Sequence, residues 1–264
     1  MTRKLMKLTI DGPLAVLAFD HQEVLNALSP ALLGDLNAAL DAIEDPASGV
    51  RCLVLTGEGR AFCAGANLQE DMTRSDGGKF DAGEQLETLY HPILRRLRNL
   101  SFPIVSAVNG PAAGAGMSFA LMGDLIIAAR SAYFMQAFRR IGLVPDCGSS
   151  WLLPRLIGRA RSLELSLLGE RLPVTKALEW GLINRVVDDG EALSEAVKLA
   201  TELANGPTVA LGLIRKMYIG STDNSFEEQL DLERQSQRTA GHASDFPEGV
   251  QAFLEKRPAK FRGR

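Results

Sequence analysis

The chain has 264 residues, of which 46% are hydrophobic and 23% are charged, and its formal net charge is −3. This length and composition fit one large domain, or one domain with an appendage, with ample material for a core. The slightly acidic balance gives no general electrostatic basis for binding nucleic acid. The first residues lack an apolar signal-peptide core, and no uninterrupted apolar stretch reaches membrane-spanning length, so no membrane association is expected.

The cysteines and histidines show no spacing that is typical of a metal site or a disulfide framework. Cys52, Cys63 and Cys147 have no paired or metal-type spacing. Cys52 and Cys63 stand in apolar surroundings, which favours reduced core residues and a cytoplasmic setting. The three histidines are also scattered, and no local motif joins them. We therefore expect no metal site.

The first half of the chain predicts alternating strands and helices. Two β-type runs, 5–10 and 14–19, flank Asp11-Gly12, which is a hairpin signal. Ser29 and Pro30 suit the N-cap and first position of a helix that continues to about residue 44. Further strands are expected over 52–56, 104–108, 125–129 and 133–135, with helices over 84–100 and 117–122. Residues 69–83 carry charges and three glycines and predict a mobile loop. This alternation predicts an α/β core.

The last third of the chain predicts almost only helices. They are expected over 149–156, 161–168, 175–180, 191–204, 207–218, 225–239 and 247–255, with one short strand over 184–187. A helical appendage of this kind has to bury its apolar faces, partly on a neighbouring subunit. We therefore divide the chain into a core over residues 1–200, which carries the site, and a helical oligomerisation region over residues 201–264.

Two turns of small residues, 63–66 and 113–116, stand out in the core. Each ends a strand-like run and could offer an unpaired backbone N–H to the same oxygen. The second turn also leads into a helix start, where free N–H groups favour negative charge. Gly/Ala turns are common, however, so two ordinary turns remain the alternative.

In this context the sequence resembles the crotonase, or enoyl-CoA hydratase/isomerase, superfamily. The matching pieces include GRAFCAGA over 59–66 and PIVSAVNG over 103–110, and they run in family order over nearly the whole chain. The other pieces are 25–27, 52–57, 114–116, 123–128 and 181–183. The resemblance implies an α/β fold, namely a crotonase-type spiral of ββα turns with a helical C-terminal trimerisation region. It also implies a homotrimer or a hexamer made of two trimers, and an acyl-CoA thioester as substrate, with no cofactor beyond it.

The resemblance also implies the binding residues. In the family, two backbone N–H groups hold the thioester oxygen, and they map onto Ala66 and Ala115. Removing a proton next to a thioester places charge on that oxygen, and each preset donor lowers the barrier by roughly 3–4 kcal/mol. The CoA-binding positions map onto Gln22, Glu23, Val24, Leu25, Ala64, Ala66, Asn67, Leu68, Gly114, Lys260 and Phe261. The last two often come from a neighbouring subunit in the family, and a solvated tail charge is the alternative for Lys260.

The chain departs from the family's hydratases at their two catalytic glutamates. These map onto Ser118 and Phe138, and neither side chain can serve as a carboxylate base. Asp146 remains nearby, at the place where several Δ3,Δ2-enoyl-CoA isomerases of the superfamily keep a single acid. One carboxylate can remove a proton at one carbon and return it at another, and burial beside Phe138 would raise its pKa. The alternative for Asp146 is the N-cap of a helix that starts near residue 149.

A closer resemblance to one isomerase branch of the superfamily is carried by 90–97, 112–116, 127–132, 142–148, 151–155 and 229–234. It implies a small aromatic or medium-length acyl-CoA as the substrate. We therefore predict an acyl-CoA isomerase with Asp146 as base and Ala66 and Ala115 as oxyanion donors. A slow hydratase, or another enzyme that uses the same enolate, is the first alternative. The second is a non-catalytic protein that binds acyl-CoA or RNA.

Overall fold

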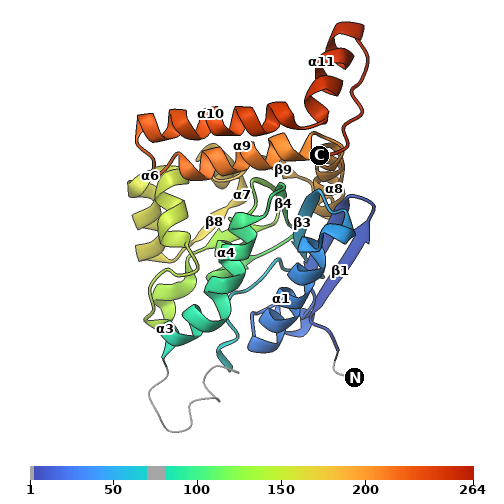
Figure 1. The fold of residues 1–264 in the computed structure, drawn as a ribbon. Helices are drawn as coiled ribbons and strands as arrows, with labels where there is room; N and C mark the ends of the chain where they lie inside the picture. The colour runs from blue at the N-terminus through green and yellow to red at the C-terminus, as the bar shows by residue number, and fades with distance from the viewer. Residues whose placement is uncertain (1–2, 70–80) are drawn as a thin grey trace.

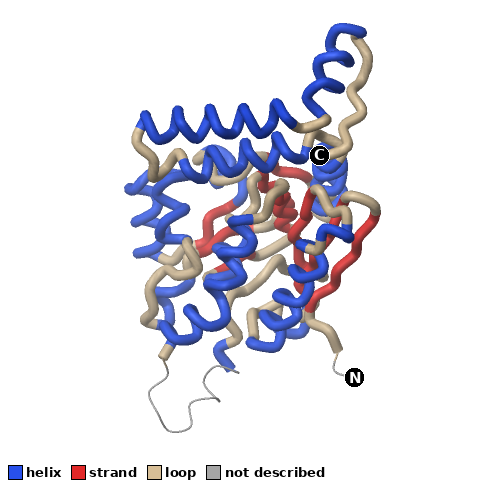
Figure 2. Tube along the Cα trace, in the orientation of Figure 1, coloured by secondary structure: helices blue, strands red, loops and turns tan. Residues whose placement is uncertain are grey.

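The computed structural model describes residues 3–69 and 81–264, and its main sheet has six strands in the order β1-β2-β3-β4-β6-β9 (Figure 1). The strands are β1 (Met6–Asp11), β2 (Leu14–Phe19), β3 (Cys52–Gly57), β4 (Ile104–Val108), β6 (Leu125–Ala129) and β9 (Arg185–Val187). The first pair is antiparallel, which confirms the hairpin, and the pairs that follow are parallel. Figure 2 shows the central strands lying among the helices and the hairpin of β1 and β2 at the edge of the molecule.

Both faces of the central strands are buried, as parallel sheets require. In β3, Cys52 and Val54 pack in a cluster with the alanines of α8 (Ala192–Ala204). Leu53 and Leu55, which point to the opposite face, belong to the larger core that includes α1 (Pro30–Glu44). The α8 alanines recur every four residues, so one smooth helix face lies against the sheet.

A second, smaller sheet joins the segments that carry the site. Its strands are β5 (Ala112–Ala113), β7 (Tyr133–Met135) and β8 (Arg171–Pro173), in that order. The helix α5 (Ala115–Ala120) begins directly after β5, and the 3-10 helix η4 (Ala137–Ile141) follows β7. The strands β5 and β8 were not predicted, because two or three residues are too few to show an alternating pattern.

Helices cover the rest of the core. They are the short η1 (Gln22–Val24), η2 (Pro46–Ser48) and α3 (Ala82–Gln85), the π-helix η3 (Leu86–Tyr90), α4 (His91–Asn99), α6 (Ser149–Leu168) and α7 (Val174–Glu179). The helix predicted over 84–100 is the run of α3, η3 and α4. Gly158 in α6 has non-helical angles, φ 78° and ψ 159°, so the predicted break between two helices is confirmed. The predicted mobile loop falls largely on 70–80, outside the described residues.

The C-terminal helices are α8, α9 (Thr208–Gly220), α10 (Phe226–His242) and α11 (Asp245–Glu255). Figure 1 shows α10 lying along α9, whereas α11 extends away from the rest of the chain. A capping box starts α10: the Ser225 hydroxyl accepts from the Glu228 N–H, and the Glu228 carboxylate accepts from the Ser225 N–H. No helix in the described parts of the chain is long and apolar enough to cross a membrane.

Arg215 fastens α9 to the core. Its side chain is 6% exposed, and its Nε lies 2.8 Å from both carboxylate oxygens of Asp124, just before β6. The guanidinium also donates to the backbone carbonyls of Leu97 (2.8 Å) and Leu100 (3.0 Å) at the end of α4. A buried guanidinium with this many partners holds α9 in one position on the core.

Candidate active site

The two small-residue turns pack directly against each other. A parallel bridge joins Cys63 to Ala112, and the Ala113 N–H donates to the Cys63 carbonyl at 3.0 Å. A Cβ on Gly116 would lie 2.2 Å from that same carbonyl oxygen. Gly65 has φ +97°, and a Cβ there would lie 2.9 Å from the Ala113 oxygen. The backbones therefore approach so closely that only glycine fits at these two positions.

Two backbone N–H groups at this junction have no hydrogen-bond partner among the described residues. Two hydrogen bonds form the bridge between Leu28 and Ala66: the Leu28 N–H donates to the Gly65 carbonyl at 2.7 Å, and the Asn67 N–H donates to the Leu28 carbonyl at 2.8 Å. The Ala66 N–H takes no part in this bridge. Within residues 3–69 and 81–264, neither the Ala66 nor the Ala115 N–H donates a hydrogen bond. The position of a Cβ on Gly65 is 3.5 Å from the Ala115 nitrogen, so the turns meet next to both groups. Free N–H groups from adjacent turns can hold an oxyanion.

An aromatic ring lies against the second turn. Gly114, just before Ala115, has φ 52° and ψ −130°, a combination that is strained for other residues. A Cβ on Gly114 would lie 3.9 Å from Cζ of Phe138, which comes from η4 and is only 6% exposed. The Phe138 ring therefore forms an apolar wall next to the second turn.

Asp146 is a partly buried carboxyl group in the turn before α6. Its side chain is half-buried, and its Oδ1 is fully buried with no hydrogen-bond partner in the described structure. Burial raises the pKa of the Asp146 carboxyl, and the neighbouring Cys147 thiol and the His91 imidazole oppose this shift. The N-cap alternative is wrong, because the N-cap of α6 is Gly148 and no side chain caps the helix. The carboxylate is thus left available for chemistry.

Three donors fix the backbone of Asp146. Its carbonyl oxygen accepts from the Ser149 N–H (3.0 Å), the Ser149 hydroxyl (2.9 Å) and the Ser118 hydroxyl (3.1 Å). Cys147 and Gly148, with φ 51° and 83°, turn the chain between Asp146 and α6. The role of Ser118 was not predicted. The available signal was a polar residue inside the apolar run 117–122, and it was interpreted only as a missing carboxylate.

A cavity of about 770 Å³ lies between α4, α6 and α9 and reaches the turn that follows Asp146, but neither Asp146 nor the two small-residue turns belong to its lining. Its wall includes Cys147 and Gly148, which directly follow Asp146, and His91, whose Nδ1 is 3.0 Å from a Glu87 carboxylate oxygen. Most of the wall is apolar. Trp151 is held between two guanidinium groups, with Arg98 4.6 Å and Arg155 4.0 Å from its ring centre.

The candidate CoA residues 22–25 lie beside the first turn. The Leu25 carbonyl accepts from the Ala64 N–H at 3.0 Å, and a Cβ on Gly59 would collide with the Gln22 side chain. The fully buried Asn26 holds this loop by donating to the carbonyls of Glu58 (3.0 Å) and Ala61 (2.8 Å). Asn26 was not predicted as a structural residue, although it belongs to a matching piece.

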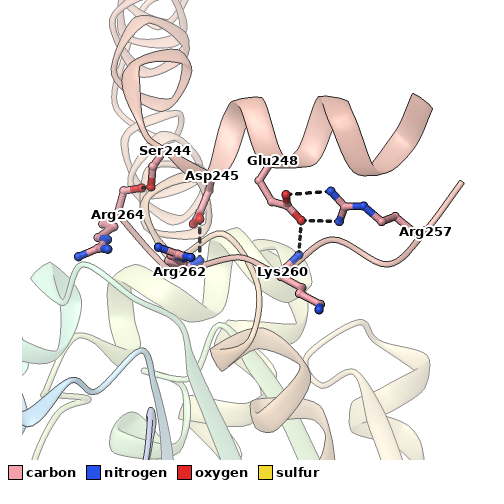
Figure 3. Close-up of a pocket in the computed structure, with 7 residues that line it drawn as sticks. All are labelled: Ser244, Asp245, Glu248, Arg257, Lys260, Arg262 and Arg264. Atoms are coloured by element: carbon pink, nitrogen blue, oxygen red, sulfur yellow. Dashed lines mark hydrogen bonds and ion pairs between the residues drawn. The ribbon is translucent and has the colours of Figure 1, made fainter. Parts of the chain in front are cut away.

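Lys260 and Phe261 lie elsewhere in this chain, on the tail that packs along α11 (Figure 3). The Lys260 N–H donates to Glu248 at 2.7 Å, and the Phe261 ring lies 3.4 Å from the position of a Cβ on Gly249. Arg257 binds both Glu248 oxygens, at 2.7 and 3.0 Å, and these bonds lower the pKa of Glu248 to about 2. Figure 3 shows the Lys260 ammonium pointing away from Glu248, and both residues line a cavity of about 520 Å³. One chain therefore does not bring Lys260 and Phe261 to the oxyanion turns.

The cysteines are free and buried, and burial raises the pKa of the Cys52 and Cys63 thiols to about 12. Such thiols are poor nucleophiles. No group of three His, Cys, Asp or Glu side chains that could hold a metal occurs among the described residues. The expectation that the protein uses no metal stays a prediction.

Comparisons with known proteins agree with this geometry. A family model described as enoyl-CoA hydratase/isomerase matches residues 9–264. The chain is 45% identical to the 1,2-epoxyphenylacetyl-CoA isomerase of Escherichia coli K12, and 31% identical to the trans-2-decenoyl-[acyl-carrier-protein] isomerase of Streptococcus mutans; each match covers 97% of both chains. The crystal structure of an enoyl-CoA hydratase from Polaromonas sp. JS666 superimposes with a TM-score of 0.89 at 36% identity, covering 97% of this chain and 99% of that one.

Proposed function

The chain belongs to the enoyl-CoA hydratase/isomerase family and has its crotonase fold, and on that premise we propose that it isomerises acyl-CoA thioesters with Asp146 as its one base. The observation that carries the proposal is the Asp146 carboxylate, whose buried Oδ1 has no hydrogen-bond partner in the described structure. The places of the two hydratase glutamates hold Ser118 and Phe138.

The mechanism follows from these groups. The thioester oxygen binds at the N–H groups of Ala66 and Ala115. Asp146 removes a proton from C2 of a 3-enoyl thioester, and the C–H electron pair moves toward the oxygen to give a dienolate that the two N–H groups stabilise. The same carboxylic acid then returns its proton to C4, which leaves the double bond between C2 and C3. Phe138 keeps water away from that side of the intermediate.

For the natural substrate we propose 1,2-epoxyphenylacetyl-CoA, with conversion of the ring epoxide to an oxepin, and Δ3,Δ2-enoyl-CoA isomerisation as a related activity. The support is the 45% identity to the Escherichia coli isomerase over 97% of both chains. A role in phenylacetate catabolism and a cytoplasmic setting belong to this proposal.

The CoA and assembly predictions complete the proposal. We propose that residues 22–25, Ala64, Ala66, Asn67, Leu68 and Gly114 bind CoA within one chain, and that Lys260 and Phe261 come from a neighbouring subunit of a trimer or a hexamer. In support, large apolar side chains of the C-terminal helices are exposed in the single chain, among them Phe253 at 83% and Tyr218 at 75%. A surface of this kind is typical of a buried interface.

The test follows the absorbance of the conjugated product formed from cis-3-hexenoyl-CoA. Asp146→Asn should reduce turnover by about 10²–10⁴-fold with fold and CoA binding retained, because a positioned base contributes that much. Asp11→Asn is the matched control: Asn-Gly favours the same hairpin as Asp-Gly, so its turnover should be unchanged. Normal turnover in a folded Asp146→Asn variant would remove Asp146 from the mechanism.

The hydratase alternative is tested in the same samples with crotonyl-CoA. We expect little hydration, because neither Ser118 nor Phe138 can activate water. Hydration at an ordinary hydratase rate would mean that another carboxylate performs that step, and the proposal of an isomerase with one base would be abandoned.

A further inference from the structure

The Ser118 hydroxyl donates its hydrogen bond outside its own helix. It lies on α5 and is fully buried. A serine inside a helix commonly donates to the carbonyl four residues earlier, which here is the Gly114 carbonyl. That oxygen instead accepts from the N–H groups of Met117 (3.0 Å) and Ser118 (3.3 Å). The Ser118 hydroxyl leaves its own helix and donates to the Asp146 carbonyl at 3.1 Å, across 28 residues of sequence.

This bond connects the two halves of the proposed site. Ala115, which offers the oxyanion N–H, is the first residue of α5, and Ser118 follows it by three residues on the same helix. One helical turn is a rigid spacer with a rise of about 1.5 Å per residue. We propose that Ser118 is a positioning residue that sets the distance between the Asp146 carboxylate and the oxyanion hole; this inference rests on the proposed role of Asp146 as base.

The other donors to Asp146 supply that link only indirectly. Both come from Ser149, three residues later in the chain. The Ser149 hydroxyl also lies 3.4 Å from Gln136 Oε1, and the Gln136 amide lies 3.3 Å from the sulfur of Met117 on α5, so this route passes through two long contacts. The segment before Asp146 is poorly covered, since Leu143 is 41% and Val144 is 75% exposed. Among the described residues, Ser118 is therefore the donor that ties the Asp146 backbone directly to α5.

The experiment compares Ser118→Ala with Ser106→Ala. Ser106 is also a fully buried serine, but its hydroxyl has no hydrogen-bond partner in the described structure, so the same atom is removed without loss of a bond. With cis-3-hexenoyl-CoA as the probe, Ser118→Ala should lower kcat by about 10- to 100-fold, since small displacements of a catalytic group cost rate steeply. KM should stay within about twofold, and Ser106→Ala should leave both constants unchanged.

Conservative variants separate positioning from packing. Ser118→Thr keeps a hydroxyl and should restore kcat to within a few-fold of the parent. Ser118→Cys keeps the volume with a weak donor, and should lose kcat as Ser118→Ala does. If the alanine variant does not fold, kcat of Ser118→Cys tests the inference in its place. Binding of hexanoyl-CoA, a saturated analogue, should be the same in all folded variants, which circular dichroism verifies.

The kinetic results separate the role of Ser118 from the role of Asp146. If Asp146→Asn abolishes turnover but both Ser118→Ala and Ser118→Cys keep kcat within twofold, the positioning role is wrong and the base assignment stands. If Ser118→Ala raises KM and weakens hexanoyl-CoA binding as strongly as it lowers kcat, Ser118 supports the pocket in general and the inference fails. If Asp146→Asn turns over normally, the proposed function fails first and the inference fails with it.

Discussion

The oxyanion side and the base side of the site are built by different means. The turns around Ala66 and Ala115 consist of backbone packed on backbone, with glycines where no Cβ fits. Asp146 is instead a side chain on a turn, and hydrogen bonds from two serines to its carbonyl hold it in place. A side chain added between two backbones in contact forces both of them apart, whereas the hydrogen bonds to one carbonyl can be removed one at a time. A single substitution in the two turns should therefore cause a large loss of stability and turnover. Substitutions around Asp146 should each cause a smaller loss.

The largest effect is expected from Gly116→Ala. The new Cβ would lie 2.2 Å from the Cys63 carbonyl oxygen, so the two turns have to separate. We expect a loss of about 3 kcal/mol of stability and at least a hundredfold loss of turnover, measured by urea unfolding and by the hexenoyl-CoA assay.

The control for this change is Gly34→Ala, in the exposed face of α1 with nothing within 4 Å of the new Cβ. Alanine there should raise stability by about 0.5–1 kcal/mol, because glycine is a poor helix former. If the Gly116→Ala variant had the stability and turnover of the parent, the two turns would have room for a Cβ, and the close backbone contact would not be required.

Both kcat/KM and stability should depend on pH through the Asp146 carboxyl. Burial raises the pKa of Asp146, so kcat/KM should fall, as the pH decreases, at a higher pH than the value near 4 of an exposed aspartate. Stability should change in the opposite direction: the folded state binds the proton more tightly, so unfolding becomes easier as pH rises from the unfolded-state pKa through the folded-state pKa.

Asp146→Asn should remove this stability change, and urea unfolding of both proteins across the pH range measures it. An acid limb at the position of an exposed carboxylate would place Asp146 in solvent and contradict the structure.

The smallest effect is expected from Ser149→Ala. The variant loses the hydroxyl bond of 2.9 Å to the Asp146 carbonyl but keeps the backbone N–H bond of 3.0 Å. One hydrogen bond contributes about 0.5–1.5 kcal/mol, and the retained bond should limit the loss of kcat to about 2- to 5-fold. A loss as large as that of Ser118→Ala would mean that the local turn, and not the tie to α5, controls the base.

The parts of the site that could be predicted from sequence are those with a local signal. Gly65 and Gly116 stand in short runs of small residues after strands, and Gly158 marks the break in α6. The contact between Ser118 and Asp146 had no such signal, because it joins residues far apart in sequence and depends on how α5 lies against the turn before α6. The capping alternative for Asp146 failed because Cys147 and Gly148 both take positive φ, which moves the helix start beyond its reach.

The same distinction applies to the fold. The strands of the main sheet and the long helices were predicted, since buried runs and apolar stripes repeat over enough residues to be recognised. The strands β5 and β8 are defined by their neighbours alone. The assignment of Lys260 and Phe261 to CoA came from the resemblance, and it stays a prediction that one chain cannot test.

The Arg215 contacts bear on how this protein can be cut into pieces. A boundary at residue 200 would separate α9 from the core and leave the Asp124 carboxylate, together with carbonyl groups at the end of α4, without the guanidinium that binds them. A fusion protein or chimaera that keeps α9 together with the core would retain these contacts, and one that is cut before α9 would lose them.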